Sequence, residues 1–317
     1  MDLELDQAIS IGINKILKRA QLSSEMLRVI NTSLDADNKT GELYKWAHLT
    51  LLSCDCVGGE HEVALPGAIA MELFALAADI FDDIQDQDND DLPWRKLPNA
   101  NVVNLATCLL MLGYEAVSTI PNSGLFREVS QILNRTGIIA SDGQFQEFLY
   151  DSRKVSLEQY FEVVKKKSAS LTACACKIGA TLGGAPESLV LQLDQFGTNF
   201  GIMSQIRNDL NDFLSFEKKK DFINNRKTLP YVYLLTILKG DAAERFRELT
   251  QRGIKGLPSI GNQEREYLKQ IVLDEGVVHY CTVMYEIFRQ KAVESLRAIS
   301  VLEKRKEKMI KLVKESI

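Results

Sequence analysis

The segment VALPGAIAMELFALAADIFDDIQDQDNDD, residues 63–91, decides the fold class, because a long apolar stretch ends in a dense run of carboxylates. Residues 63–81 are apolar almost all round, which indicates a buried helix. Asp82 and Asp86 lie about one turn apart and therefore share one side of that helix. Crowded carboxylates repel one another unless a cation neutralises them. This helix end therefore predicts a cation site.

The same pattern recurs later, where residues 189–206 are apolar and Asn208, Asp209 and Asp212 follow. A Gly-Gly pair precedes each apolar stretch, at 58–59 and at 183–184. Acidic runs at helix ends are more commonly solvated surface, but the recurrence favours a site. Two such helices would face each other across a cavity that is apolar below and anionic at its mouth. Oxygen ligands without a nearby His or Cys suit Mg²⁺, so the expected ligand is an apolar chain carrying a diphosphate.

Helical periodicity holds nearly throughout the chain, with Gly and Pro at the joints and without alternating β patterns of useful length. The pattern predicts helices at 5–20, 23–35, 41–57, 61–87, 99–120, 125–152, 156–182, 186–217, 227–238, 241–252, 262–275 and 276–316, the last with a candidate break near Ser300. We therefore predict an all-α fold, a single domain over residues 1–317 that forms one large helical bundle around a central cavity.

Composition narrows the possible partners and locations. The net charge of −5 argues against a nucleic acid partner. The N-terminus lacks the pattern of a signal peptide, and Pro66, Glu72 and Asp79 interrupt the stretch 63–81, so we interpret it as a core helix. The six cysteines lie in apolar helical stretches, as reduced thiols do. We expect a cytoplasmic protein and leave membrane association open, because the basic run 304–308 is only a weak hint of it.

Basic residues supply the counterpart of the carboxylates. Basic runs are most often solvated, but residues 165–167 precede Ser168, where a buried stretch begins. Another basic run, 218–220, follows the second acidic cluster, and Arg226 and Lys227 come soon after it. A diphosphate that Mg²⁺ holds on one side needs cationic donors on the other, and these basic residues would supply them.

These residues resemble the trans-isoprenyl diphosphate synthases, from about Gly41 to Leu312. Asp82-Asp83 with Asp86 or Asp88 is similar to the first aspartate-rich motif of that family, and residues 205–213 are similar to the second. Lys167-Ser168 lies where the family has a Lys-Thr pair, and residues 220–222 and 227–230 resemble the stretch after the second motif. The resemblance implies the isoprenoid synthase fold, an allylic prenyl diphosphate as substrate, Mg²⁺ as cofactor and a homodimer.

The resemblance also implies a role for each matching residue. The implied catalytic residues are Asp82, Asp83, Asp86 and Lys167. The implied metal ligands are Asp82, Asp86 or Asp88, Asn208, Asp209 and Asp212. The implied diphosphate-binding residues are Lys167, Ser168, Gln205, Lys220 and Arg95.

The chain departs from the family where those synthases bind a second substrate, isopentenyl diphosphate. Phe74 replaces a His, Pro93-Trp94 replaces an Arg pair, and residues 41–46 retain few of the family's early basic residues. Each lost charge-assisted hydrogen bond costs about 1.5–3 kcal/mol, so this second site is not expected. Trp46 and Trp94 either line the groove for another acceptor or simply pack. Phe74, two turns before Asp82, is expected to limit the donor's length.

Three local segments resemble the ComQ tryptophan prenyltransferases of bacterial quorum sensing: residues 82–94, 162–167 and 285–291. This resemblance implies transfer of a farnesyl or geranyl group to a tryptophan of a peptide pheromone precursor. The alternatives are a polyprenyl diphosphate synthase, a terpene cyclase derived from one, which Asn208 suggests, and a non-catalytic subunit of such a synthase.

Overall fold

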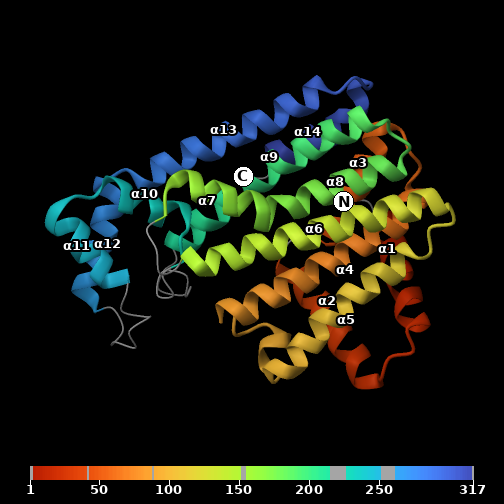
Figure 1. Ribbon diagram of the computed structural model, residues 1–317, viewed down its shortest axis with the longest axis horizontal. Helices are drawn as coiled ribbons and strands as arrows, with labels where there is room; N and C mark the ends of the chain where they lie inside the picture. Colours follow the sequence, from red (N-terminus) through yellow and green to blue (C-terminus); the bar gives the residue numbers. More distant parts are fainter. Residues whose placement is uncertain are drawn as a thin grey trace. The chain divides into compact units, whose positions relative to one another are not determined.

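The computed structural model describes residues 3–40, 43–87, 89–150, 155–214, 226–250 and 261–315. Within these ranges the elements are helices and none is a strand, which confirms the predicted all-α class (Figure 1). The α-helices are α1 (Leu3–Arg19), α2 (Ser24–Thr40), α3 (Lys45–Val57), α4 (His61–Asp86), α5 (Asn99–Val117), α6 (Ser123–Tyr150), α7 (Leu157–Val164), α8 (Ser170–Leu182), α9 (Glu187–Leu214), α10 (Leu229–Ile237), α11 (Gly240–Thr250), α12 (Asn262–Asp274), α13 (Val277–Ala298) and α14 (Glu303–Glu315).

Two short helical elements were not predicted. A 3₁₀-helix, η1 (Pro93–Lys96), follows the first acidic cluster. A π-helix, η2 (Lys165–Ala169), divides the predicted helix 156–182 into α7 and α8. The break that was predicted near Ser300 separates α13 from α14.

The chain divides into two compact units, each made of separate segments. Unit 1 comprises Met1–Ile138, Leu171–Thr198 and Ala292–Ile317, and unit 2 comprises Ile139–Ser170 and Asn199–Lys291. The helices α6, α8, α9 and α13 therefore contribute residues to both. The prediction of a single domain stays a prediction.

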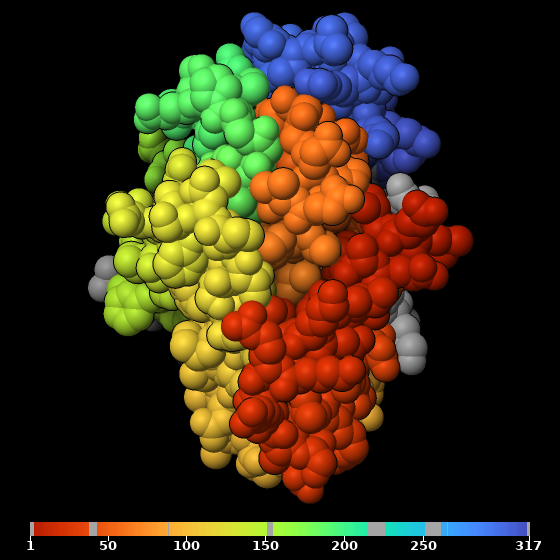
Figure 2. Space-filling view, turned by 90° about the vertical axis from the view of Figure 1, so that its right-hand side faces the viewer, coloured from red at the N-terminus to blue at the C-terminus, as the bar shows by residue number. Residues whose placement is uncertain are grey.

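Helix α4 is central to unit 1 and packs against α3 and α5. Its apolar stretch is mostly buried, including Met71, Leu73 and Leu76, as expected of a core helix. By length and composition α4 and α5 are both apolar enough to cross a membrane, but 72% of the α4 window is buried inside the structure. Figure 2 shows one face of this unit, with α1 and α2 in red beside the orange segment that contains α3 and α4.

The two Gly-Gly pairs that precede the acidic helices lie against each other in unit 1. A Cβ placed on Gly59, in the turn from α3 to α4, would lie 2.4 Å from the Cα of Gly183, in the turn from α8 to α9. A Cβ on Gly179 of α8 would lie 2.1 Å from the carbonyl oxygen of Thr50 in α3. Only glycine allows so close a backbone approach. The repeated pattern in the sequence is thus a pair of neighbouring turns.

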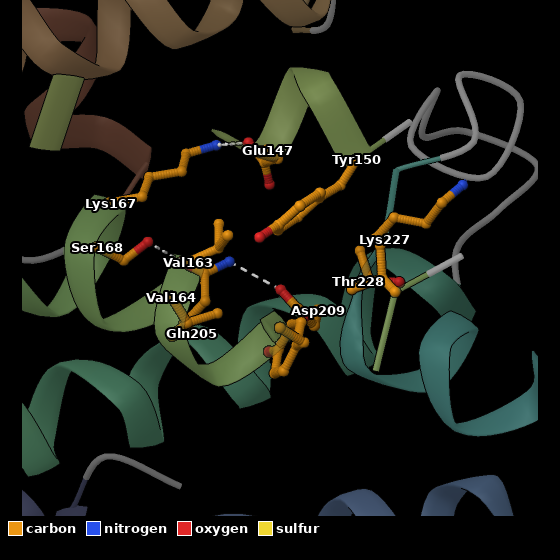
Figure 3. A pocket seen from close by; sticks show the side chains of 12 residues that line it. Glu147, Tyr150, Val163, Val164, Lys167, Ser168, Gln205, Asp209, Lys227 and Thr228 are labelled. Atoms are coloured by element: carbon orange, nitrogen blue, oxygen red, sulfur yellow. Dashed lines mark hydrogen bonds and ion pairs between the residues drawn. The ribbon is translucent and has the colours of Figure 1, made fainter. Parts of the chain in front are cut away.

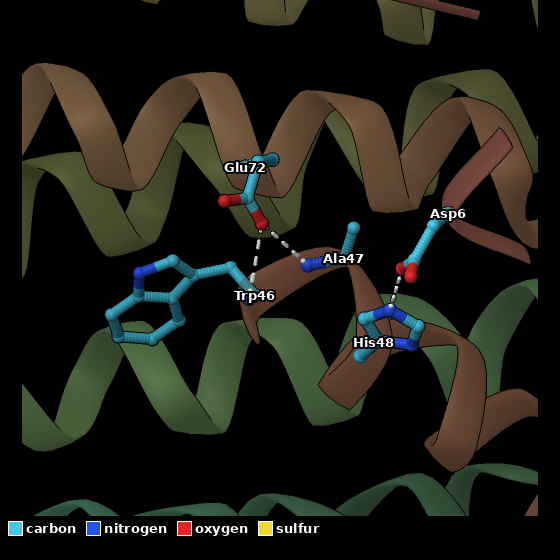
Figure 4. Close-up of polar contacts among 5 residues, drawn as sticks. All are labelled: Asp6, Trp46, Ala47, His48 and Glu72. Atoms are coloured by element: carbon cyan, nitrogen blue, oxygen red, sulfur yellow. Dashed lines mark hydrogen bonds and ion pairs between the residues drawn. The ribbon is translucent and has the colours of Figure 1, made fainter. Parts of the chain in front are cut away.

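Buried polar contacts hold the start of α3 in place (Figure 4). Residue Tyr44 precedes α3 with φ 50° and provides no side-chain cap. The carboxylate of Glu72 on α4 accepts hydrogen bonds from the backbone N–H groups of Trp46 and Ala47 instead, at 3.0 and 2.8 Å. Next to them, His48 Nε2 lies 2.7 Å from Asp6 Oδ1, which ties α1 to α3. An N-cap supplied by another helix couples the fold of α3 to that of α4.

Unit 2 has its own hydrophobic core. Ile206 of α9, Leu229 and Val232 of α10, Phe246 of α11 and Val277 of α13 are fully buried within it. In Figure 1, α10, α11 and α12 lie together at the left. Helix α7 packs against α10. This arrangement places the second acidic motif, on α9, beside the start of α10.

Candidate functional site

The first acidic motif occupies the last turn of α4, which contains no basic residue. Asp82 and Asp86 are partly exposed there. The C-terminal end of a helix carries the negative pole of the helix dipole and favours cations, so carboxylates at this position are unfavourable by themselves. This placement supports the predicted cation site. Asp88 lies outside the described residues.

Asp83 has a different environment from Asp82 and Asp86. It is buried, its Oδ1 accepts a hydrogen bond from Asn89 Nδ2 at 2.7 Å, and its Oδ2 accepts one from the indole Nε1 of Trp94 at 2.8 Å. Asp83 thus fixes the segment after α4 onto the helix. These contacts give Asp83 a structural task, and its implied catalytic role stays a prediction.

Arg95 lies on η1, directly after Trp94. Its Nη2 lies 3.2 Å from Asp90 Oδ1, so the guanidinium already has a carboxylate partner in the same segment. The implied contact of Arg95 with a diphosphate is not tested by this arrangement.

Another carboxylate on α4, that of Asp79, was not predicted as a site residue. Asp79 precedes Asp82 by three residues and therefore lies on the same side of the helix. Burial raises the pKa of Asp79 to about 7, while the Lys45 ammonium opposes this rise and the charges of Asp37, Asp82 and Asp83 add to it. Asp79 extends the acidic face of α4 by one turn toward the core.

The second acidic motif lies in the last turns of α9, whose end also lacks a basic residue. Asp209 is only 4% exposed. Its Oδ1 accepts a hydrogen bond from Gln205 Nε2 at 2.7 Å, and its Oδ2 accepts from Tyr160 Oη at 2.7 Å and from the backbone N–H of Leu229 at 2.8 Å. Burial raises the pKa of Asp209 to about 6, and these hydrogen bonds oppose the rise. Asp209 therefore joins α7, α9 and α10.

The two motifs share one design. Each contains a buried carboxylate that an aromatic side chain anchors, Asp83 by Trp94 and Asp209 by Tyr160. The other motif residues are at least partly exposed, and they are Asp82 and Asp86 on α4 and Asn208 and Asp212 on α9. The buried member positions the motif, and the exposed members remain the candidate metal ligands.

The side chains fit Mg²⁺ chemically but do not enclose it. Among the described residues, no group of three or more His, Cys, Asp or Glu side chains is arranged to hold a metal ion. Mg²⁺ commonly binds one or two carboxylates and completes its shell with water and phosphate oxygens, so an open acidic helix end fits it. The prediction that both motifs serve one cavity involves both units and stays a prediction.

Lys167 and Ser168 lie on the π-helix η2 and line a pocket within unit 2 (Figure 3). Lys167 Nζ lies 2.7 Å from Glu147 Oε2 of α6, and Ser168 Oγ donates to Gln205 Oε1 at 2.8 Å. The hydrogen bond from Gln205 to Asp209 continues this chain into the second motif. The structure therefore brings together three predicted donor-binding residues, Lys167, Ser168 and Gln205. Single-turn π-helices occur frequently at functional sites.

Two polar residues of this pocket, Glu147 and Tyr160, were not predicted, whereas Lys227 was expected among the basic residues after the second motif. Lys227 is 8% exposed, and its ammonium lies 4.6 Å from the ring centroid of Tyr231. It belongs to the segment 227–230, which resembles the family downstream of the second motif, and the structure places it in the same pocket as Lys167. Glu147 and Tyr160 carry no local signal. The predicted Lys220 lies outside the described residues.

A family model described as polyprenyl synthetase matches residues 46–258. The chain belongs to this family. A relative described as tryptophan prenyltransferase ComQ, from Bacillus subtilis (strain 168), is 26% identical over 301 residues, which cover 94% of this chain and 95% of the relative. A geranylfarnesyl diphosphate synthase from Methanosarcina mazei is 29% identical over 199 residues, which cover 62% of this chain and 66% of that enzyme. Because the chain belongs to this family, the protein is a transferase.

Solved structures of the family have the same fold. A polyprenyl synthetase from Streptomyces coelicolor A3(2) superimposes with a TM-score of 0.83 at 21% identity and covers 99% of this chain and 98% of its own. A polyprenyl synthase from Caulobacter crescentus CB15, solved in complex with calcium and isoprenyl diphosphate, gives a TM-score of 0.81 at 18% identity, with 99% and 95% covered. The predicted isoprenoid synthase fold is confirmed.

Proposed function

We propose that this polyprenyl synthetase relative transfers a farnesyl or geranyl group from its allylic diphosphate to a tryptophan of a peptide pheromone precursor. Its similarity to the Bacillus subtilis tryptophan prenyltransferase extends over 94% of the chain. One structural observation carries the proposal, and it concerns Trp94. This residue stands where the resembling synthases have an Arg of the isopentenyl diphosphate site. Trp94 is buried, and its indole N–H is hydrogen-bonded to Asp83. A cationic partner for a second diphosphate is therefore missing at this position.

The charge around Lys45 supports the same interpretation. Lys45 is the basic residue that remains in the early segment, and burial lowers its pKa while the carboxylates of Asp79, Asp37 and Glu72 more than compensate. Carboxylates of its own unit therefore stabilise the charge of Lys45. A second diphosphate would have to compete with these carboxylates, whereas an uncharged indole would meet no such repulsion.

At the first motif Mg²⁺ would be held by Asp82 and Asp86, with Asp88 as a further candidate. At the second motif it would be held by Asn208 and Asp212. When bound, it supplies positive charge to the leaving diphosphate. Lys167 and Ser168 bind and orient the donor, and Gln205 connects Ser168 to Asp209. Asp83 and Asp209 hold the two motifs in place through their aromatic partners.

In the proposed reaction the C1–O bond of the donor breaks and its electron pair leaves with the diphosphate. Indole C3 of the acceptor tryptophan, the electron-rich ring carbon, forms the new bond to C1. A backbone nitrogen of the peptide then closes a ring at C2 and loses its proton. Exclusion of water from the pocket strengthens the contacts of Lys167 with the diphosphate during bond cleavage.

The proposal includes a homodimer in the cytoplasm. Large apolar side chains of unit 1 are exposed on α5 and on the first part of α6, among them Met111 at 55% and Ile138 at 62%. Apolar side chains gathered on neighbouring surface helices are typical of protein interfaces. A second copy of the chain would cover them.

The second candidate function is chain elongation, the condensation of an allylic diphosphate with isopentenyl diphosphate. The 29% identity to the geranylfarnesyl diphosphate synthase of Methanosarcina mazei favours it. The two functions share the donor site and differ in the acceptor, so one assay separates them.

The test incubates purified protein and Mg²⁺ with geranyl or farnesyl diphosphate and a tryptophan-containing precursor peptide, and follows the peptide by mass spectrometry. We expect a peptide that has gained one prenyl group. A matched peptide with Trp→Ala should remain unmodified. In a parallel incubation with isopentenyl diphosphate, efficient formation of a longer prenyl diphosphate would favour chain elongation and contradict the proposal.

A further inference from the structure

The Lys167 ammonium, which the proposed function assigns to the donor diphosphate, already has an anionic partner. Its Nζ lies 2.7 Å from Glu147 Oε2, and the two side chains are only 19% and 21% exposed. Figure 3 shows this ion pair at the edge of the pocket, where the side chains of Lys167 and Glu147 extend toward each other from two different helices. Such a partly buried pair is less screened by water than a surface pair.

The surroundings single out Glu147 as the exchangeable partner. Asp209, the other carboxylate of the pocket, accepts hydrogen bonds from Gln205, Tyr160 and the backbone of Leu229 and is thereby committed to the fold. Among the described residues of the pocket, Glu147 ties no other helix in this way, and its partner is Lys167. A carboxylate oxygen at hydrogen-bond distance from an ammonium occupies the same place as a phosphate oxygen would.

We propose that Glu147 is an internal competitor of the donor: its carboxylate holds Lys167 in the empty pocket, and the diphosphate must displace it to bind. This inference rests on the proposed donor site. Once the diphosphate is bound, the Glu147 carboxylate faces a like charge, and re-forming the pair with Lys167 helps to expel the diphosphate product. Glu147 is thus a positioning residue that weakens binding of both donor and product.

A neighbouring ion pair provides a matched control. Lys166 Nζ lies 2.8 Å from Asp142 Oδ2, so this pair joins the same two elements, α6 and η2. Its side chains are more exposed, at 33% and 50%, and neither residue lines the pocket. Asp142→Asn removes the same charge from the same helix without altering the partner of Lys167.

The experiment measures binding of inorganic pyrophosphate and of farnesyl thiolodiphosphate, an unreactive donor analogue, by calorimetry with Mg²⁺ present. Glu147→Gln should lower both dissociation constants by about three- to tenfold, because a partly buried ion pair no longer has to open. Asp142→Asn should leave both constants unchanged. In steady-state assays, Glu147→Gln should lower the KM for the donor and strengthen inhibition by pyrophosphate.

If Glu147 instead orients Lys167 for binding, Glu147→Gln will weaken or not change the affinity, and the inference is wrong. It is also wrong if Asp142→Asn tightens binding equally, because the effect is then a general one of charge. Glu147→Ala, which removes the charge together with every side-chain hydrogen-bonding group, must shift the affinity in the same direction and serves if Glu147→Gln does not fold. A wild-type protein that binds neither probe would contradict the proposed donor site itself, which is a separate outcome.

Discussion

Trp94 donates its indole N–H to Asp83 Oδ2 at 2.8 Å, and both residues are buried. This bond joins η1 to the acidic end of α4, so the geometry of the first motif depends on a side chain that the resembling synthases lack. The sequence left two interpretations of Trp94, a lining of the acceptor groove or simple packing. Its burial and its hydrogen bond favour the packing role.

Replacement of Trp94 should therefore affect stability more than acceptor binding. Trp94→Phe leaves a buried carboxylate oxygen without its indole donor, which should cost about 1–3 kcal/mol of unfolding free energy. Urea unfolding measures this change, and the KM for the peptide should stay within about twofold of wild type, well under 1 kcal/mol.

Trp46 offers the matched control, because its buried Nε1 has no hydrogen-bond partner among the described residues. Trp46→Phe should therefore cost less than Trp94→Phe. A large rise in the peptide KM of Trp94→Phe, with unchanged stability, would instead place Trp94 in the acceptor groove.

Asp82→Ala should reduce prenyl transfer by at least about 100-fold, because it removes a proposed Mg²⁺ ligand and with it several kcal/mol of transition-state stabilisation. The helical fold should persist, since Asp82 is partly exposed. Turnover at saturating Mg²⁺ and circular dichroism measure the two effects. Asp91→Ala, in the exposed part of the acidic run, is the control. Near-normal activity of Asp82→Ala would contradict the proposed metal site.

Glu72 should make stability depend on pH. Burial raises its pKa from 4.5 to about 7, while the N–H groups of Ala47 and Trp46 oppose the rise. The folded protein therefore binds a proton that the unfolded chain has lost between these pH values, so the unfolding free energy falls as pH rises through this window. The contribution is on the order of 3 kcal/mol.

Glu72→Gln cannot titrate, so its unfolding free energy should decline less than that of wild type between pH 5 and pH 7, by roughly this amount. Urea unfolding at a series of pH values measures the difference. Parallel curves for the two proteins would show that Glu72 is ionised in the folded state throughout this range.

Structural features that depend on local sequence patterns were predicted from the sequence. The helices α4 and α9 and their acidic ends follow from periodicity and from Gly-Gly joints, and the structure has them within a few residues of the predicted bounds. Contacts between distant residues leave no such pattern. The Tyr160 and Asp209 side chains lie 49 residues apart in sequence, and Lys167 and Glu147 lie 20 apart. Their pairing depends on how α7 packs against α9 and how η2 packs against α6, which a single sequence does not specify.

For the same reason, the sequence alone led us to predict the same roles for Asp83 and Asp209 as for their neighbours in each motif. In the sequence each is one carboxylate among several, and only burial separates the anchoring carboxylates from the exposed ones. The π-helix at Lys165–Ala169 is another example, because its residues continue the helical periodicity of α7 into α8.

Phe74 should limit the length of the prenyl chain that the protein accepts as donor. Phe74 is 5% exposed on α4, and its ring atom Cζ lies 3.3 Å from the position that a Cβ on Gly137 of α6 would occupy. The ring thus fills the space between α4 and α6, two turns before Asp82. If the prenyl chain extends from the motif along α4, Phe74→Ala should raise kcat/KM for geranylgeranyl diphosphate relative to farnesyl diphosphate.

Truncation of a buried Phe costs about 3–5 kcal/mol, so Phe74→Leu is tested in parallel as the milder change, with thermal unfolding as a check. Val63→Ala, at a position of α4 that is 47% exposed, should leave the donor preference as in wild type. If both Phe74 variants keep the wild-type donor preference, loss of the ring has opened no space along the path of the prenyl chain. A residue of another helix would then limit the donor length.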